Sequence, residues 1–147
     1  SSFVEGRMAD ISQAPDEAFA GKLMGDGIVM FPTSNVIYAP ADVTIETVFP
    51  TKHALGLKTK AGTEILLHVG IDTVKLDGKG FNVFVNDGDK VKKGEKLMEV
   101  DLAFIKENAA STAIPMVFTN LEENQKIIWI EKEKTEYKAN EDPTEII

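Results

Sequence analysis

Apolar stretches in this chain are short, and Gly, Asp, Asn or Pro separates most of them from the next. The turns at Gly25-Asp26-Gly27, Asp77-Gly78 and Asn86-Asp87-Gly88-Asp89 contain residues that tolerate positive φ. Sustained helical periodicity is almost absent, so the pattern predicts an all-β chain that forms a sandwich or barrel. The expected strands are Ile28–Phe31, Val36–Ala39, Val43–Phe49, His53–Lys58, Glu64–Val69, Phe81–Val85, Lys96–Val100, Met116–Thr119 and Lys126–Glu131.

Two short helices interrupt this pattern. The first is expected over Pro15–Leu23, because proline suits the first helical turn and Asp16 and Glu17 favour its positive end. The second is expected over Leu102–Asn108, where Asp101 can cap the first free amides. Neither helix is long enough to dominate the fold, which leaves the class all-β.

The C-terminal stretch Glu131–Asp142 is rich in charge, but it contains Tyr137 and is followed by Ile146-Ile147. We therefore expect a final strand here rather than a solvated tail. A dilute copy of the segment Asn86–Glu95 also recurs at Glu136–Glu141. Such a turn-then-strand element is typical of hybrid β-barrels, such as biotinyl and lipoyl carrier domains.

Length and charge exclude several classes of function. The chain has 147 residues, which suits one domain spanning 1–147. A net charge of −8 disfavours nucleic acid and anionic membrane surfaces as partners. No apolar run approaches the ~20 residues that span a bilayer, and the first residues lack a signal-peptide pattern. We therefore expect a cytoplasmic protein without direct membrane insertion. Since cysteine is absent, the chain has no disulfide, thiolate nucleophile or cysteine-bound zinc.

The only two histidines, His53 and His68, are the natural candidates for chemistry near neutral pH. The segment between them is predicted to be a β-hairpin that turns at 59–62. If the ends of that turn pair, His53 lies directly opposite His68, with Cβ atoms ~4.5–5.5 Å apart. The same register places Leu55 opposite Leu66 on that face, so both imidazoles would have apolar neighbours.

Two adjacent neutral imidazoles are compatible with three roles. They can be structural, each satisfied by a backbone group. They can bind a metal, although two histidines without a clustered third ligand are a weak zinc signature. They can also relay a phosphoryl group, one ring attacking phosphorus while the other donates a hydrogen bond to the phosphoryl oxygens.

Residues near both histidines favour the relay. Gly70 follows His68 by two positions, where a backbone carbonyl can accept one imidazole N–H and leave the other nitrogen unprotonated. Thr51 precedes His53 by two positions and offers a hydroxyl that can hold that ring. No phosphate-binding glycine loop or dinucleotide fingerprint is present, so we expect no cofactor and a phosphoryl group delivered by another protein.

Two motifs carry a resemblance to a known family. The runs Phe49–Leu57 and Glu64–Val74, the second containing His-Val-Gly-Ile-Asp-Thr-Val, resemble the glucose-type enzyme IIA of the bacterial phosphoenolpyruvate-dependent sugar phosphotransferase system. Segments that fit the same family in the same order are Lys22–Gly27, Ala39-Pro40, Gly88–Val91 and Pro115–Val117. The resemblance covers the chain from about Gly6 onward and implies an antiparallel β-sandwich of the duplicated hybrid type.

The resemblance also implies roles for individual residues. His68 would carry the phosphoryl group on Nε2, taking it from the phosphohistidine of the phosphocarrier HPr and passing it to a cysteine of the sugar-specific IIB domain. His53 would stabilise that group and Thr51 would orient His53. The residues implied to form an apolar docking surface with acidic contacts are Phe19, Leu23, Met24, Phe49, Leu66, Val74, Asp16 and Asp72.

Of three other interpretations, one fails on the residues and two remain open. A swinging-arm carrier fails, because it would need a lysine after Glu99-Val100, where this chain has Asp101. A metallohydrolase could use both histidines with Asp72 or Glu64 as a third ligand. A regulatory or metal-binding β-domain would use the same pair without phosphoryl transfer. The sequence does not identify the sugar, nor whether the domain stands alone or belongs to a larger permease.

Overall fold

A computed structural model describes residues 4–23, 25–120, 127–129, 136–137 and 144–146. Short strands dominate it, and every strand pair is antiparallel, which confirms the predicted all-β sandwich. The strands are β1 Gly6–Asp10, β2 Asp26–Pro32, β3 Val36–Tyr38, β4 Val43–Val48, β5 Ala54–Thr59, β6 Glu64–His68, β7 Phe81–Val83, β8 Lys90–Val91, β9 Lys96–Val100, β10 Ile114–Phe118, β11 Ile127–Trp129, β12 Glu136–Tyr137 and β13 Thr144–Ile146. The helical segments are η1 Ile11–Gln13, α1 Glu17–Ala20, η2 Val74–Leu76 and α2 Leu102–Asn108.

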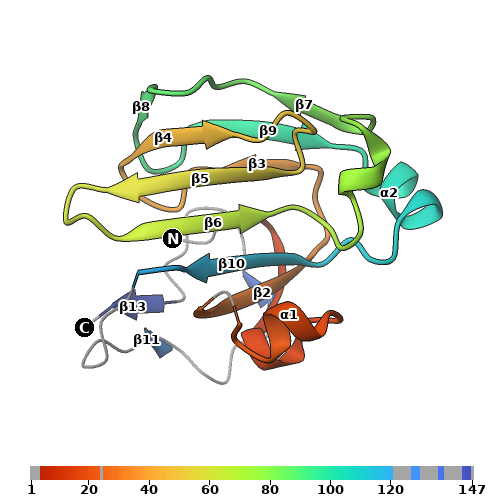
Figure 1. Ribbon diagram of the computed structural model, residues 1–147, viewed down its shortest axis with the longest axis horizontal. Helices are drawn as coiled ribbons and strands as arrows, with labels where there is room; N and C mark the ends of the chain where they lie inside the picture. The colour runs from red at the N-terminus through yellow and green to blue at the C-terminus, as the bar shows by residue number, and fades with distance from the viewer. Residues whose placement is uncertain (1–3, 24, 121–126, 130–135, 138–143, 147) are drawn as a thin grey trace.

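Among the described residues, the strands form one large sheet and two small ones. The large sheet has the order β12-β1-β2-β10-β6-β5-β4-β8, and the three-stranded sheet has the order β3-β9-β7. In Figure 1, β4, β5, β6 and β10 run side by side, α1 lies below β10 and α2 lies at the right-hand edge. The β11–β13 pair forms the remaining two-stranded sheet.

The main core is shared by the large and the three-stranded sheets. Alternate side chains of the large sheet, such as Leu55 and Leu67, are fully buried with Ile37 and Met98 of the smaller sheet. A second, smaller cluster includes Val29 and Val117 of the large sheet, with α1 residue Phe19. Strand side chains alternate between the two faces of a sheet, so the large sheet packs against apolar side chains on both faces at these strands.

The β5–β6 hairpin differs by one residue from its predicted register. Ala54, rather than His53, is the partner of His68, and Leu55 pairs with Leu67 rather than with Leu66. The turn has three residues instead of two, because the Thr59 amide donates to the Thr63 carbonyl at 3.0 Å. Its last residue, Gly62, has φ 90°, as expected for a three-residue hairpin loop that ends in a left-handed residue.

The β4–β5 connection also differs from the prediction. Strand β4 ends at Val48 instead of Phe49, and β5 begins at Ala54 instead of His53. The Lys52 amide donates to the Phe49 carbonyl at 2.7 Å, and Lys52 has φ 61°. His53 is therefore the last residue of a turn and not a strand residue.

The first helix is shorter than predicted. Only Glu17–Ala20 is helical within the expected range Pro15–Leu23, and the Asp16 carboxylate caps it by accepting from the Ala18 amide at 2.8 Å. The helix ends because the Gly21 amide closes the last turn and Lys22 adopts φ 60°. The second helix, Leu102–Asn108, has the predicted bounds, and Asp101 caps it at the Phe104 amide.

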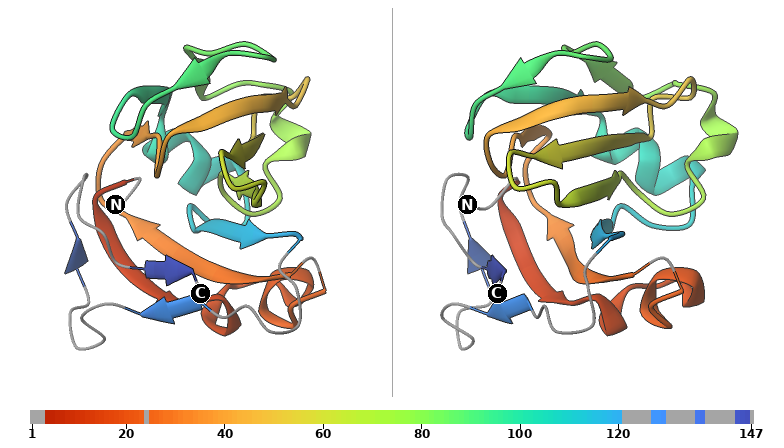
Figure 2. Two further views of the ribbon diagram at one scale, coloured as in Figure 1. Left: turned by 90° about the vertical axis from the view of Figure 1, so that its left-hand side faces the viewer. Right: turned by 60° about the vertical axis from the view of Figure 1, so that its left-hand side comes forward.

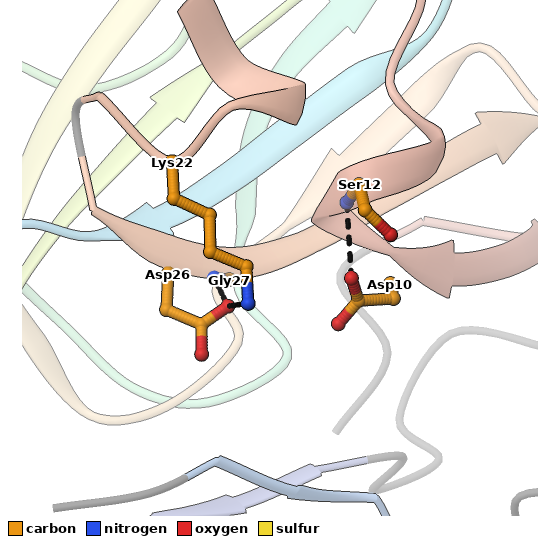
Figure 3. A network of polar contacts seen from close by, with 5 residues as sticks. All are labelled: Asp10, Ser12, Lys22, Asp26 and Gly27. Carbon is orange, nitrogen blue, oxygen red and sulfur yellow. Dashed lines mark hydrogen bonds and ion pairs between the residues drawn. The ribbon is translucent and has the colours of Figure 1, made fainter.

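Polar contacts hold both ends of the segment that carries α1. At its start, the Ser12 amide donates to the Asp10 carboxylate at 3.0 Å. At its end, the Asp26 carboxylate accepts from the Gly27 amide at 2.8 Å and forms an ion pair with Lys22 at 3.5 Å (Figure 3). These contacts tie the segment to β1 and β2, which flank it in the chain.

The C-terminal region contains the expected strands where it is described. Strand β12 pairs with β1, and β13 pairs with β11, which lies within the predicted strand Lys126–Glu131. Figure 2 shows these short strands beside β1 and β2. Residues 126 and 130–131, and residues 138–141 of the dilute repeat, lie outside the described residues. Strands β1 and β8 were not predicted, because neither contains an apolar run that stands out from its surroundings.

Candidate functional site

His68 is the last residue of β6 and lies on the face of the large sheet opposite the main core. Ile65 and Leu67 belong to the main core, whereas Leu66 packs against the smaller cluster that contains Phe19. Because strand side chains alternate, His68 shares the face of Leu66. The Phe19 and His68 rings contact each other, with centroids 5.0 Å apart. Helix α1 thus covers one side of this imidazole.

The loop after β6 determines which nitrogen of His68 carries the proton. His68 Nδ1 lies 2.7 Å from the Gly70 carbonyl oxygen, which can only accept, so Nδ1–H donates and Nε2 keeps a free lone pair. Gly70 has φ 79°, and a Cβ there would lie 2.5 Å from the Thr73 methyl carbon. Thr73 is fully buried and donates its hydroxyl to the Val69 carbonyl at 2.8 Å. The loop therefore specifies glycine at position 70, and it includes a supporting residue, Thr73, that was not among the predicted site residues.

His53 lies beside His68 in spite of the changed register. The two ring centroids are 4.9 Å apart, with the planes at 76°. In a regular strand His53 would share the face of Val69, whose amide donates to the His53 carbonyl at 2.7 Å. Alternation does not apply, because His53 follows Lys52 in the turn. The predicted proximity of the rings is confirmed, and the register from which it was predicted is wrong.

Two neighbours hold the His53 ring. The Thr51 hydroxyl lies 2.6 Å from Nδ1 of His53. The Phe49 ring contacts the imidazole edge-on, with the two ring centroids 5.7 Å apart. If the Thr51 hydroxyl donates to Nδ1, the proton of neutral His53 is on Nε2. In that tautomer His53 is a hydrogen-bond donor at the nitrogen that Thr51 does not contact.

Both imidazoles are neutral at pH 7. Burial, and to a smaller extent the nearby His68, lower the pKa of His53 to about 4, since burial disfavours the charged ring and two cations would repel each other. Burial also lowers the pKa of His68, while the Gly70 hydrogen bond and the negative charge of Asp16 act in the opposite direction. A neutral His68 has the lone pair that a nucleophile needs.

The comparisons with known proteins agree with this geometry. The phosphoenolpyruvate-dependent sugar phosphotransferase system EIIA 1 family matches residues 1–124. The chain belongs to this family. It is also similar to the glucose permease IIA from Mycoplasma capricolum, with 37% identity over 97% of this chain and 91% of that chain and a TM-score of 0.89. The predicted resemblance is confirmed, and the chain is a phosphocarrier of a sugar phosphotransferase system.

The residues predicted to form the docking surface of this EIIA chain differ widely in exposure. Leu23 is 81% exposed and Val74 is 53% exposed, whereas Phe49 and Leu66 are half-buried. Phe19 is only 4% exposed and contacts His68 instead of solvent. Met24 lies outside the described residues.

The two acidic residues predicted to contact a partner of the EIIA chain make local contacts in the structure. Half-buried Asp16 caps α1. Asp72 is exposed, has φ 62° and forms an ion pair with Lys75 at 2.7 Å. Within the described part of the EIIA chain, no three His, Cys, Asp or Glu side chains are grouped as a metal site requires. No helix among the described residues is long and apolar enough to cross a membrane.

Proposed function

We propose that His68 is the phosphoryl-carrying residue, which accepts the group from the phosphohistidine of HPr and passes it to a cysteine of a sugar-specific IIB domain. The observation that carries this proposal is the 2.7 Å contact between His68 Nδ1 and the Gly70 carbonyl, beside a second imidazole. It leaves Nε2 of His68 as the nucleophile. The site lies within one domain that spans 1–147 and works in the cytoplasm, without a cofactor or metal.

In the first step, the lone pair of His68 Nε2 attacks the phosphorus of the donor phosphohistidine. The new N–P bond forms as the donor N–P bond breaks, and the donor nitrogen takes back that electron pair. The Nδ1 proton stays in its hydrogen bond to Gly70. The His68 ring gains positive charge in this step, and the carbonyl dipole stabilises it because hydrogen bonds to charged donors are stronger.

His53 and Thr51 stabilise the transferred group. With the Thr51 hydroxyl donating to Nδ1, His53 donates Nε2–H to a phosphoryl oxygen. The low pKa of His53 keeps this ring an uncharged donor at pH 7. A neutral donor stabilises the phosphoryl oxygens without the strong attraction that would hold the group in place, which suits a relay.

In the second step, a cysteine thiolate of the IIB domain attacks the same phosphorus. An S–P bond forms, the N–P bond breaks, and His68 Nε2 recovers its lone pair with no net proton transfer. Both partners use one docking surface, in which exposed Leu23 and Val74 and half-buried Phe49 and Leu66 supply apolar contacts. Met24 is a further apolar contact in this proposal, and Asp16 and Asp72 supply the acidic contacts. Phe19 supports the surface from beneath through its contact with His68.

Reconstitution with phosphoenolpyruvate, enzyme I and HPr tests the proposal. We expect one acid-labile, base-stable phosphoryl group on the native chain and none on His68→Gln. His53→Gln should still be loaded but should transfer poorly to a IIB domain.

Thr51→Val should slow transfer about fivefold, the equivalent of one hydrogen bond of ~1 kcal/mol. Labelling of folded His68→Gln would mean that the nucleophile is another residue, and rapid transfer by His53→Gln would remove its proposed role.

A further inference from the structure

A lysine-lined groove lies at the opposite end of the β4–β5 hairpin from His53. The hollow measures about 330 Å³, which is within the range of small-molecule sites. Four lysines line it, Lys58, Lys60, Lys90 and Lys92, together with Thr44 and Asp42. In Figure 1, β4, β5 and β8 meet at the upper left, away from the end of β6 that carries His68.

The sheet register fixes the inner row of this groove. Thr44 on the central strand pairs with Lys58 on one side and with Lys90 on the other. Directly paired residues share a face, so these three residues form one row across the sheet, with Thr44 between the two lysines. Neighbouring strands are ~4.8 Å apart, which places the two lysine backbones ~10 Å from each other, wide enough to admit an anionic group between them.

The positive charge of the row is not neutralised within the described part of the chain. Neither Lys58 nor Lys90 forms an ion pair with a described residue, although Glu64 is the cross-strand partner of Lys58. Both lysines are exposed, while Thr44 is half-buried. Four lysines around one hollow contrast with the net charge of −8, so the groove is a local basic site on an acidic protein.

Asp42 supplies a hydrogen-bond acceptor at the groove, in addition to the positive charge of the lysines. Its Oδ1 accepts from the Lys93 amide at 2.9 Å, which anchors the carboxylate at the groove. A carboxylate repels a second anionic group but accepts hydrogen bonds from hydroxyl groups. The groove thus offers one binding position for an anionic group, at Thr44, and one acceptor for hydroxyl groups, at Asp42.

We propose that this groove binds a phosphate monoester of a small polyhydroxylated compound. The phosphoryl group lies between Lys58 and Lys90 and accepts a hydrogen bond from Thr44, while the hydroxyls of the ligand donate to Asp42. The concave shape favours a small ester over an anionic membrane surface. The site is separate from His68, so binding here does not depend on the proposed phosphoryl relay.

NMR titration of the ¹⁵N-labelled chain with glycerol 3-phosphate tests this proposal. We expect saturating shift changes at the amides of Thr44, Lys58 and Lys90. Binding by Lys58→Gln/Lys90→Gln should be about tenfold weaker, since two charge-assisted contacts are lost. The matched control Lys79→Gln/Lys106→Gln removes two exposed lysines elsewhere and should bind like the native chain.

Additional probes separate the two parts of the site. Inorganic phosphate should bind more weakly than glycerol 3-phosphate, and glycerol alone should not shift these amides. Asp42→Asn keeps an oxygen acceptor but loses the charge, so the preference for the ester over inorganic phosphate should shrink. Thr44→Val keeps the branched shape of a strand residue and should weaken both phosphates.

Two kinds of result would contradict a phosphate-monoester site in this groove. Shift changes that grow linearly to high millimolar concentration, or an equal loss in the lysine control, would overturn the proposal. So would tight binding of phosphatidylglycerol vesicles or of a polyglutamate peptide through Lys58 and Lys90 while glycerol 3-phosphate does not bind. Heat denaturation of each variant verifies that it is folded, so that a loss of binding is attributable to the groove.

Discussion

At the scale of single residues, Gly70 does most to define the chemistry of His68. Its carbonyl fixes the proton on Nδ1, and its φ of 79° and its contact with Thr73 leave no room for a side chain. The sequence predicted the acceptor correctly, because a glycine two positions after a histidine allows the chain to turn back toward the ring. It did not predict Thr73, since a threonine after a turn is common and carries no sign of its burial.

Substitution of Gly70 by alanine should destabilise the fold and disturb the His68 tautomer. The new methyl group meets the Thr73 methyl carbon at 2.5 Å in a left-handed conformation, so we expect a loss of about 2–3 kcal/mol in the free energy of unfolding. Gly62→Ala is the matched control, because Gly62 has φ 90° but no atom within 4 Å of the added Cβ. Urea unfolding measures both, and equal losses would show that the Thr73 contact is unimportant.

The low pKa of His53 makes stability depend on pH. Its value is about 4 in the folded chain and 6.5 when exposed, so below pH 6.5 the unfolded chain binds more protons. The free energy of unfolding should therefore fall as pH decreases from 6.5 to 4, by at most about 3 kcal/mol from this residue. His53→Gln cannot titrate and should show a shallower decline in urea unfolding. Identical pH profiles for the two chains would mean that His53 is not held in its neutral form.

At the scale of elements, the hairpins show what local pattern can and cannot predict. The existence of β4, β5, β6 and α2 followed from alternation, turn residues and the Asp101 cap. The register of the β5–β6 hairpin could not be predicted, because two- and three-residue turns that end in glycine look alike in sequence. A one-residue difference should have separated the histidines. They meet only because the turn before β5, with Lys52 at φ 61°, redirects His53.

Substitutions of Lys52 test whether the turn before β5 places His53. Lysine at φ 61° is strained, whereas glycine adopts this conformation readily. Lys52→Gly should therefore be about 0.5–1 kcal/mol more stable to urea than Lys52→Ala, which lacks the same side-chain contacts but keeps a Cβ. If Lys52→Ala is as stable as Lys52→Gly, position 52 is not left-handed in solution, and the explanation for the placement of His53 fails.

At the scale of the whole molecule, the family and the all-β class could be predicted, whereas the exposure of the docking residues could not. Phe19 and Leu23 belong to the same predicted surface, yet one is 4% and the other 81% exposed. Sequence shows that both are apolar and close together. Only the packing of α1 against β6 reveals that Phe19 contacts His68.

Net charge should control how fast the donor is captured. With a charge of −8, this chain attracts a donor with a basic rim, and salt screens that attraction. Raising ionic strength from 0.05 M to 0.5 M should slow the second-order phosphorylation rate by about tenfold. Asp72→Asn, which tolerates the left-handed backbone of Asp72, should reduce the salt dependence in stopped-flow assays. A rate that does not change with salt would exclude electrostatic capture.

The nitrogen that carries the phosphoryl group is the most direct test of the central claim. Nitrogen-15 NMR of the phosphorylated, ¹⁵N-histidine-labelled chain detects the N–P bond at a single ring atom. We expect phosphorus coupling at Nε2 of His68, with its Nδ1 still protonated. Coupling at Nδ1 of His68, or at either nitrogen of His53, would contradict the account.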